Sequence, residues 1–195
     1  PPVCNADGSF NLVLSNPTGN ITQYSIKAVA PNALPGFTDI VNATWAGAGT
    51  INVTYPAATA AGTYTFALTI QDGNNLGCVL TKNFSVKIDA KPTVKITANP
   101  DEICAGQATT LSIDNSNTGY TIKWTLDGTA LPAADNKVSF SHTPTKVGDN
   151  VYAVTVTNGA CTVTDNVTVK VRSMPTADAG KPEIKQCDTK DFTVT

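Results

Sequence analysis

The chain has 195 residues and a formal net charge of −2, and only 14% of its residues are charged. Its lysines and arginines are scattered along the sequence, so it has no basic face of the kind that binds nucleic acid. It also has no run of about eighteen apolar residues, so we expect no insertion into a membrane.

Threonine and valine dominate the composition, with 30 and 18 residues respectively. Both are β-branched, and their restricted side chains suit the pleated, half-buried surface of a sheet. No stretch free of proline and glycine has the apolar spacing of an amphipathic helix. The composition therefore predicts an all-β fold.

Two similar β-hairpins are predicted at residues 63–88 and 151–171, where apolar and polar residues alternate on both sides of a turn. Each hairpin has a cysteine just after its turn, Cys78 in the first and Cys161 in the second. Aligned on these cysteines, the hairpins share identical threonine, asparagine, valine and lysine residues at equal offsets. We interpret them as the last two strands of a repeated β-sandwich.

The alternation predicts which side chains are buried. Successive side chains of a strand point to opposite faces, so Tyr152, Val154 and Val156 share one face. Lys82 and Asp165 are exceptions, because each lies where the alternation requires an apolar residue. Either a β-bulge, or a strand that changes sheet at this point, redirects these two side chains, or they lie at the rim of the sandwich.

A second feature recurs at the same spacing. Pro92 and Pro175 follow the two hairpins at equivalent positions, which gives a repeat of 83 residues, within the size of an immunoglobulin-like module. Cys104 and Cys187 each follow their proline by 12 residues. We therefore expect three units: a module at 1–90 that lacks its first strand, a complete module at 91–173, and the first two strands of a third module at 174–195.

Few residues separate the last strand of one unit from the first strand of the next, and the proline between them stiffens the connection. We therefore expect β-sandwich modules that abut and lie end to end.

The repeat also suggests how the five cysteines pair. Each module offers one cysteine near its second strand and one after its penultimate strand. We therefore predict disulfides Cys4–Cys78 and Cys104–Cys161, one inside each module, which leaves Cys187 unpaired. Disulfides persist in oxidising compartments, so this pattern indicates an extracellular protein.

No metal, cofactor or catalytic site is predicted. The sequence has no Cys-x-x-Cys pair, and its one histidine, His142, is next to Ser141. Adjacent residues of a strand point to opposite faces, so these two cannot form a nucleophile and base. Calcium at the acidic residues Asp101, Glu102 and Asp178 near the module ends is a less favoured alternative, because Ca²⁺ requires six or more oxygen ligands.

The two tryptophans have different expected roles. Trp124 lies in the middle of a predicted strand, and a tryptophan there packs on the disulfide in immunoglobulin-like modules, so we expect it in the core. Trp45 lies among small residues outside a clear strand. We select Trp45 as the candidate carbohydrate contact, because aromatic rings stack on sugars.

Several segments resemble a known group of repeats. "INVTYPAATAAGTYTFALTI" and "GCVLTKNFSVKI" resemble the PKD-like repeats of giant secreted proteins of Bacteroidota. "ICAGQATTLSI" and "YTIKWTLDGTALP" are similar to the immunoglobulin-like repeats of the same proteins. The glycine-aspartate signature of true PKD domains is poorly matched, so the first module is termed PKD-like.

This resemblance implies a cell-surface adhesin exported by the type IX secretion system, serving attachment or gliding motility. The segment would then be a stalk on the bacterial cell surface. Its expected partners are neighbouring modules of the same chain, surface polysaccharide, or the outer-membrane secretion and motility machinery. Two alternatives are carbohydrate-binding modules of a polysaccharide-degrading enzyme, and filament subunits that assemble by strand addition.

Overall fold

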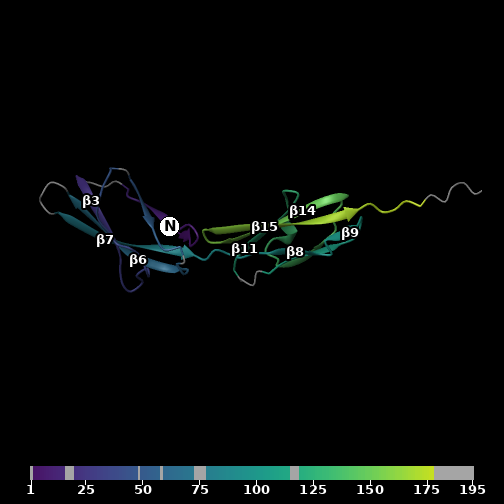
Figure 1. Ribbon diagram of the computed structural model, residues 1–195, viewed down its shortest axis with the longest axis horizontal. Coiled ribbons are helices and arrows are strands. Elements are labelled where there is room, and N and C mark those ends of the chain that lie inside the picture. Colours follow the sequence, from purple (N-terminus) through teal and green to yellow (C-terminus); the bar gives the residue numbers. More distant parts are fainter. Residues whose placement is uncertain are drawn as a thin grey trace, which may run out of the picture.

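A computed structural model of the chain describes residues 2–15, 20–47, 49–57, 59–72, 78–114 and 119–177. Over these residues the chain consists of β-strands and connecting loops, with one short 3-10 helix at Pro132–Ala134. No helix in the described ranges is long and apolar enough to cross a membrane. The strands form two β-sandwiches, module 1 and module 2, which lie end to end (Figure 1).

Module 1 consists of two packed sheets. Its strands are β1 (Pro2–Cys4), β2 (Ser9–Val13), β3 (Ile21–Ala28), β4 (Ile40–Thr44), β5 (Thr50–Thr54), β6 (Gly62–Asp72) and β7 (Val79–Asp89). One sheet has the order β1-β7-β6-β3-β4, and the second pairs β2 with β5. The aromatic rings of Phe10, Phe66 and Phe84 pack together between the two sheets.

Module 2 repeats this plan. Its strands are β8 (Ile96–Asn99), β9 (Glu102–Cys104), β10 (Thr109–Ile113), β11 (Thr121–Leu126), β12 (Thr129–Ala130), β13 (Ser139–His142), β14 (Gly148–Asn158) and β15 (Cys161–Arg172). Its sheets have the orders β12-β11-β14-β15-β9 and β13-β10-β8. The predicted all-β class is confirmed.

The β14–β15 hairpin follows the predicted alternation. Tyr152, Val154 and Val156 are fully buried on one face, as expected. The pairing of β14 with β15 is regular through the contact of Val154 with Asp165, so the alternative of a β-bulge is wrong there. Asp165 is half-buried at the rim of the sandwich, and its carboxylate accepts a hydrogen bond of 3.0 Å from the backbone of Ile96.

The same holds for Lys82 in the β6–β7 hairpin. The two strands pair without a break through Leu68 and Lys82, and Lys82 is exposed. Neither exception has a bulge and neither side chain is buried, as the rim alternative requires.

Trp124 is the centre of the module 2 core. Its side chain is 1% exposed, its ring packs edge-on against Phe140, and its Nε1 donates a hydrogen bond of 3.0 Å to the carbonyl of Lys137. The predicted core position is confirmed. The predicted contact with a Cys104–Cys161 disulfide is wrong, because that disulfide does not form.

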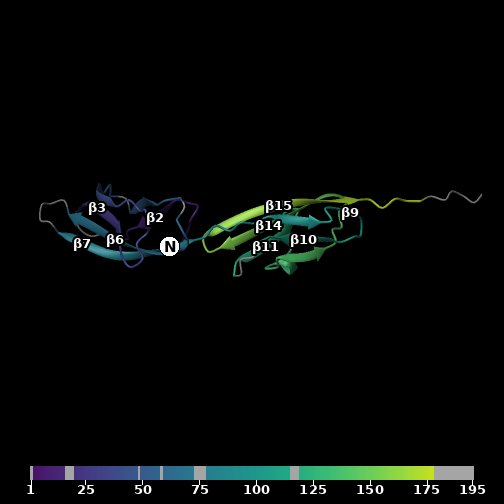
Figure 2. The same ribbon diagram turned by 60° about the horizontal axis from the view of Figure 1, so that its bottom comes forward.

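Each module has two distinct ends. The short strand β1 runs parallel to the end of β7, with Cys4 opposite Asp89, and β9 runs parallel to the end of β15, with Cys104 opposite Arg172. We call this the acceptor end of a module. The opposite end, which we call the hairpin end, contains the end of β6 and the start of β7 in module 1, and the turn from β14 to β15 in module 2. The hairpin end of module 2 faces module 1, and β9 lies at the far end of module 2 (Figures 1 and 2).

Candidate functional site

The most elaborate site in the described residues is the junction between the two modules. A disulfide bond joins Cys4 at the acceptor end of module 1 to Cys161 at the hairpin end of module 2. The two Cα atoms are 4.8 Å apart although the residues are 157 positions apart in the sequence. Both side chains are buried, so the disulfide is part of a closed contact between the modules.

This bond corrects the predicted pairing. Cys161 begins β15, whereas Cys104 is opposite Arg172 at the other end of the same strand. Eleven residues of strand separate the two positions, which is about 36 Å, whereas the Cα atoms of a disulfide lie about 4–7 Å apart. Cys4 and Cys78 are kept apart along β7 in the same way. Both disulfides within single modules are therefore impossible in this fold.

The remaining cysteines are not bonded within the described chain. Cys78 and Cys104 are free and exposed, Cys78 at the hairpin end of module 1 and Cys104 at the acceptor end of module 2. Cys187 and most of the predicted third module lie outside the described residues.

Asp89 is the central polar residue of the junction. Its side chain is 4% exposed, although it carries a charge. One carboxylate oxygen lies 2.7 Å from the Nζ of Lys87, and the other accepts a hydrogen bond of 3.0 Å from the backbone N–H of Ala160 in module 2. These two hydrogen bonds, that from Lys87 first, hold the pKa of Asp89 below its ordinary value. The carboxylate therefore stays ionised and links the last strand of module 1 to the hairpin of module 2.

Further hydrogen bonds surround the disulfide. The Nδ2 of Asn158 donates to the carbonyl of Ala90 at 2.8 Å. On the side of module 1, the backbone N–H of Lys91 donates to the Oδ1 of Asn5 at 3.0 Å. The N–H of Asn5 donates in turn to the carbonyl of Asp89 at 2.9 Å. These contacts confirm that the modules abut, and they give the junction a defined geometry.

Tyr55 ties the junction to the core of module 1. Its hydroxyl donates a hydrogen bond of 2.6 Å to the carbonyl of Cys4, and its ring is part of the core cluster. Burial raises the pKa of Tyr55, which keeps the hydroxyl protonated and able to donate. The position of Cys4 is thus set by the packing of its own module.

Gly159 makes the close approach of the hairpin possible. It lies in the β14–β15 turn with a φ of +55°, in the left-handed region that favours glycine. A Cβ at this position would overlap the carboxylate of Asp89. The glycine therefore serves both the turn and the contact between modules.

Replacing Gly159 with alanine should weaken the junction. We expect the effective concentration of the Cys4 and Cys161 thiols, measured by equilibration with glutathione, to fall roughly tenfold or more, because the added Cβ overlaps the Asp89 carboxylate and breaks its hydrogen bond with Ala160, a loss of about 1–3 kcal/mol. Gly128→Ala is the matched control, since Gly128 also has a positive φ of 80° but no atom near its Cβ position. An equal loss in both variants would show that the contact with Asp89 has no effect.

The other predicted site residue, Trp45, packs inside its own module. Trp45 is half-buried, and its ring packs edge-on against Tyr24 at a centroid distance of 6.1 Å. Its ring is therefore partly packed against module 1, and the carbohydrate contact stays a prediction.

His142 lies beside the module 2 core. Its Nδ1 is 2.8 Å from the hydroxyl of the buried Tyr152, and burial raises the pKa of Tyr152 to about 12. The described residues contain no group of three or more histidine, cysteine, aspartate or glutamate side chains placed to hold a metal ion. At the acceptor end of module 2, Glu102 forms an ion pair with Arg172.

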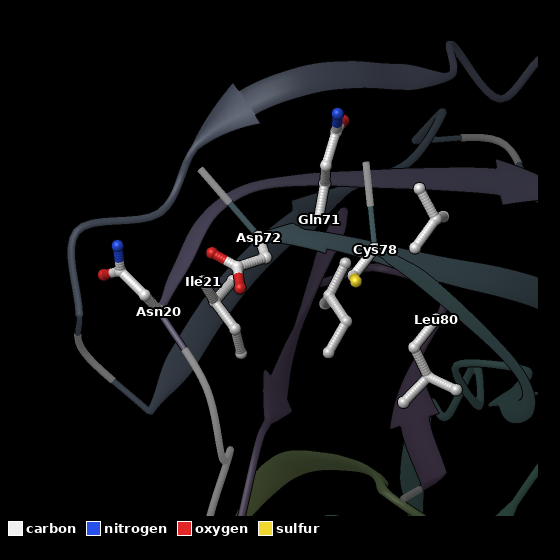
Figure 3. Close-up of a pocket in the computed structure, with 8 residues that line it drawn as sticks. Asn20, Ile21, Gln71, Asp72, Cys78 and Leu80 are labelled. Atoms are coloured by element: carbon white, nitrogen blue, oxygen red, sulfur yellow. The ribbon is translucent and has the colours of Figure 1, made fainter. Parts of the chain in front are cut away.

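A shallow recess lies at the hairpin end of module 1. Its lining includes Ile21, Asp72, Cys78 and Leu80, and the Cys78 side chain is directed into it (Figure 3). The recess has a volume of about 200 Å³, whereas small-molecule sites usually enclose about 300–1,000 Å³. It is too small for an ordinary ligand pocket.

Sequence reasoning missed Asp89, Asn158 and Gly159 as functional residues. The Asn-Gly pair looks like an ordinary hairpin turn, and nothing in it indicates a contact with another module. The available signal was Asp89 itself, a charged residue that directly follows the apolar face of β7 and precedes the boundary proline.

Comparisons with known proteins identify the type of domain. Residues 90–175 match the family described as Ig-like domain, CHU_C associated. No curated protein matches the chain. Among solved structures, the extracellular domains 3–5 of Drosophila OTK align with a TM-score of 0.55 and 14% identity, over 88% of this chain and 59% of that one.

Two further structures are similar at lower scores. Fibronectin(III)-like modules of Clostridium thermocellum CbhA align with a TM-score of 0.48 and 17% identity, over 88% of this chain and 89% of that one. Murine CEACAM1b aligns with a TM-score of 0.46 and 12% identity, over 89% and 96%. The chain is an all-β protein of immunoglobulin-like sandwiches, and residues 90–175 match an Ig-like domain family.

Proposed function

We propose that the two modules are a stiff, tension-carrying segment of the stalk of a secreted bacterial cell-surface adhesin, serving attachment or gliding. The observation behind this proposal is the Cys4–Cys161 bond between modules. A bond inside a module stabilises that module alone, whereas a bond between modules also restricts their relative movement. An oxidised cystine of this kind is typical of extracellular proteins.

The position of the bond determines the path of a pulling force. Tension applied at the amino terminus reaches Cys4 and crosses the disulfide to Cys161. It then follows β15 and leaves module 2 beyond Arg172. The chain between the two cysteines lies outside this path, so neither module is extended while the disulfide is intact.

The noncovalent contacts complement the bond. The hydrogen bonds of Asp89 and Asn158 hold the hairpin of module 2 against module 1, so bending at the junction requires breaking them. Pro92 in the connection is buried and restricts the backbone further. A stalk benefits from this stiffness because it keeps an adhesive tip at a distance from the cell.

The partners of such a stalk are neighbouring modules of the same chain, and its tip would meet surface polysaccharide or the secretion and motility machinery of the outer membrane. Trp45 is the residue of this segment that we propose for a sugar contact.

Single-molecule pulling between the two chain ends tests the proposal. In oxidised protein we expect no release of the chain between Cys4 and Cys161. After reduction, the extension should increase by roughly 500 Å, the extended length of the residues that the disulfide had enclosed. The Cys4→Ser/Cys161→Ser variant should extend in this way without reductant.

Cys78→Ser/Cys104→Ser is the matched control, because both cysteines are exposed and unbonded in this chain. This variant should remain short under oxidising conditions and lengthen on reduction. Equal extension of the oxidised and reduced wild-type chain would contradict the proposed force path.

A further inference from the structure

We propose that Cys78 and Cys104 are two open halves of the same inter-module disulfide, each closed in the full protein by a flanking module of the same type. This inference rests on the proposed function, since it requires a tandem array of modules. The evidence for it is that Cys104 has the same structural position in module 2 as Cys4 in module 1, and Cys78 the same position in module 1 as Cys161 in module 2.

The acceptor ends of the two modules are built alike around Cys4 and Cys104. The N–H of Cys4 donates to Asp7 Oδ2 at 3.2 Å, and the N–H of Cys104 donates to Gln107 Oε1 at 3.0 Å. Asp7 and Gln107 each return a backbone hydrogen bond to the cysteine carbonyl, at 2.9 and 3.0 Å. Module 2 therefore presents Cys104 in the setting that Cys4 has in the closed junction.

The residue after each cysteine extends this correspondence. The N–H of Asn5 donates to the carbonyl of Asp89 at 2.9 Å, and the N–H of Ala105 donates to the carbonyl of Arg172 at 2.8 Å. Each acceptor cysteine is thus fixed against the end of the last strand of its own module.

The hairpin ends correspond as well. Cys161 begins β15 opposite Asn158, the last residue of β14. Cys78 directly precedes β7, and its carbonyl accepts a hydrogen bond of 3.2 Å from the N–H of Asp72, the last residue of β6. Cys78 thus has the place in module 1 that Cys161 has in module 2.

The bonded and the free cysteines differ in burial. Cys4 and Cys161 are buried by their contact, whereas Cys78 and Cys104 are exposed. Two apolar residues beside Cys78, Val79 and Leu80, are 57% and 63% exposed. Together with the recess in Figure 3, they form an uncovered apolar surface around the sulfur.

The acceptor end of module 2 has an uncovered apolar residue too. Met174 is 66% exposed and has the position that Lys91 has in the closed junction, because the two residues precede Pro175 and Pro92. Arg172 there has the position of Asp89. The proposed junction of module 2 with a following module would therefore have the same disulfide as the first junction but different side chains around it.

The two free thiols cannot bond to each other within one chain. Cys78 lies at the hairpin end of module 1 and Cys104 at the acceptor end of module 2, which are the two outer ends of the pair of sandwiches (Figure 1). The occupant that fits Cys104 is the hairpin end of a following module, and the occupant that fits Cys78 is the acceptor end of a preceding one. In the sequence, Cys187 follows Pro175 by the same 12 residues that separate Cys104 from Pro92.

Disulfide mapping of the native full-length protein tests this arrangement. The protein is isolated without reductant, its free thiols are blocked with N-ethylmaleimide, and it is digested and analysed by mass spectrometry. We expect the Cys104 peptide to be linked to the following module, at the cysteine just after its last hairpin turn. The Cys78 peptide should be linked to the acceptor cysteine of the preceding module, and neither thiol should carry maleimide.

A Cys104→Ser variant of the full-length protein provides the control. Its cross-link to the following module should disappear, and the released hairpin cysteine should become labelled with maleimide, while Cys4–Cys161 remains. Recovery of Cys78 or Cys104 as labelled thiols would overturn the inference, as would a bond between Cys78 and Cys104 of two different copies.

These failures are distinguishable from a failure of the proposed function. If Cys4–Cys161 is found while Cys78 and Cys104 are labelled, the proposal that the inter-module disulfide repeats along the protein is wrong. The proposal of a stiff two-module segment is then unaffected. If Cys4–Cys161 itself is absent, the proposed force path is wrong.

Discussion

Replacing Cys4 and Cys161 together by serine is expected to lower the free energy of unfolding by up to about 5 kcal/mol, distributed over both modules. The bond closes a loop with a sequence separation of 157 residues. In the chain-entropy model, a loop of this length strongly restricts the unfolded chain, and that restriction is lost in the variant. Both modules should be affected, because the loop contains nearly all of module 1 and most of module 2.

The two tryptophans of the chain allow each module to be followed separately. Trp45 lies in module 1 and Trp124 in module 2, so Trp124→Phe and Trp45→Phe backgrounds each leave one fluorescent reporter. Urea unfolding is then measured in each background with and without the two serine substitutions. We expect the unfolding midpoint to fall for both reporters.

Cys78→Ser/Cys104→Ser should leave both midpoints unchanged, since it retains the bond between modules. A loss of stability confined to one reporter would be the behaviour of a disulfide inside one module and would contradict the structure.

The sequence was sufficient to predict the local architecture. Alternation in a β-branched chain predicted the hairpins and their buried faces, and Tyr152, Val154 and Val156 are indeed fully buried. The core position of Trp124 followed from its place in a strand of an immunoglobulin-like module. These features depend on neighbours along the chain or on one hairpin partner, and periodicity reports such contacts directly.

The cysteine pairing was wrong because it depends on which end of a sandwich each residue occupies. The spacing correctly showed that Cys4 corresponds to Cys104 and Cys78 to Cys161, but that correspondence is compatible with bonds within or between modules. The deciding fact is the parallel pairing of a three-residue strand with the end of the last strand, as in Cys104 opposite Arg172. So short a strand has no periodicity, and its partner lies about seventy residues away.

The junction residues were missed for a related reason. Asp89 and Gly159 are far apart in the sequence, and each has an ordinary local role, one at a strand end and the other in a turn. Their contact exists only when two modules are placed together, so no pattern within one repeat reports it. Burial of the Asp89 carboxylate is the structural sign of the contact.

Asp89→Ala is expected to destabilise the junction by about 1.5–3 kcal/mol, because it removes the charged acceptor of the hydrogen bond from the backbone N–H of Ala160. The ion pair contributes less, since the Lys87 side chain is 62% exposed and screened by water. Asp89→Asn should cost less than the alanine variant, because an amide oxygen can still accept from Ala160.

The effect of Asp89 should depend on pH with a defined sign. Its pKa in the folded protein is lower than its ordinary value of 3.8. Its carboxylate therefore contributes its full stabilisation above about pH 4, and this contribution is lost as the pH falls through the lowered pKa. Below that point a protonated aspartate and an asparagine are nearly equivalent in shape and charge.

Urea unfolding of module 1, followed by Trp45 fluorescence from neutral pH down to pH about 2.5, measures this contribution. We expect the stability difference between wild type and Asp89→Asn to be constant above about pH 4 and to shrink towards zero below it. Asp127→Asn is a matched control, because the pKa of Asp127 is also lowered, by a hydrogen bond from Lys146, but at an exposed position of module 2. A difference for Asp89→Asn that persists unchanged to the lowest pH would show that the ionised carboxylate does not hold the modules together.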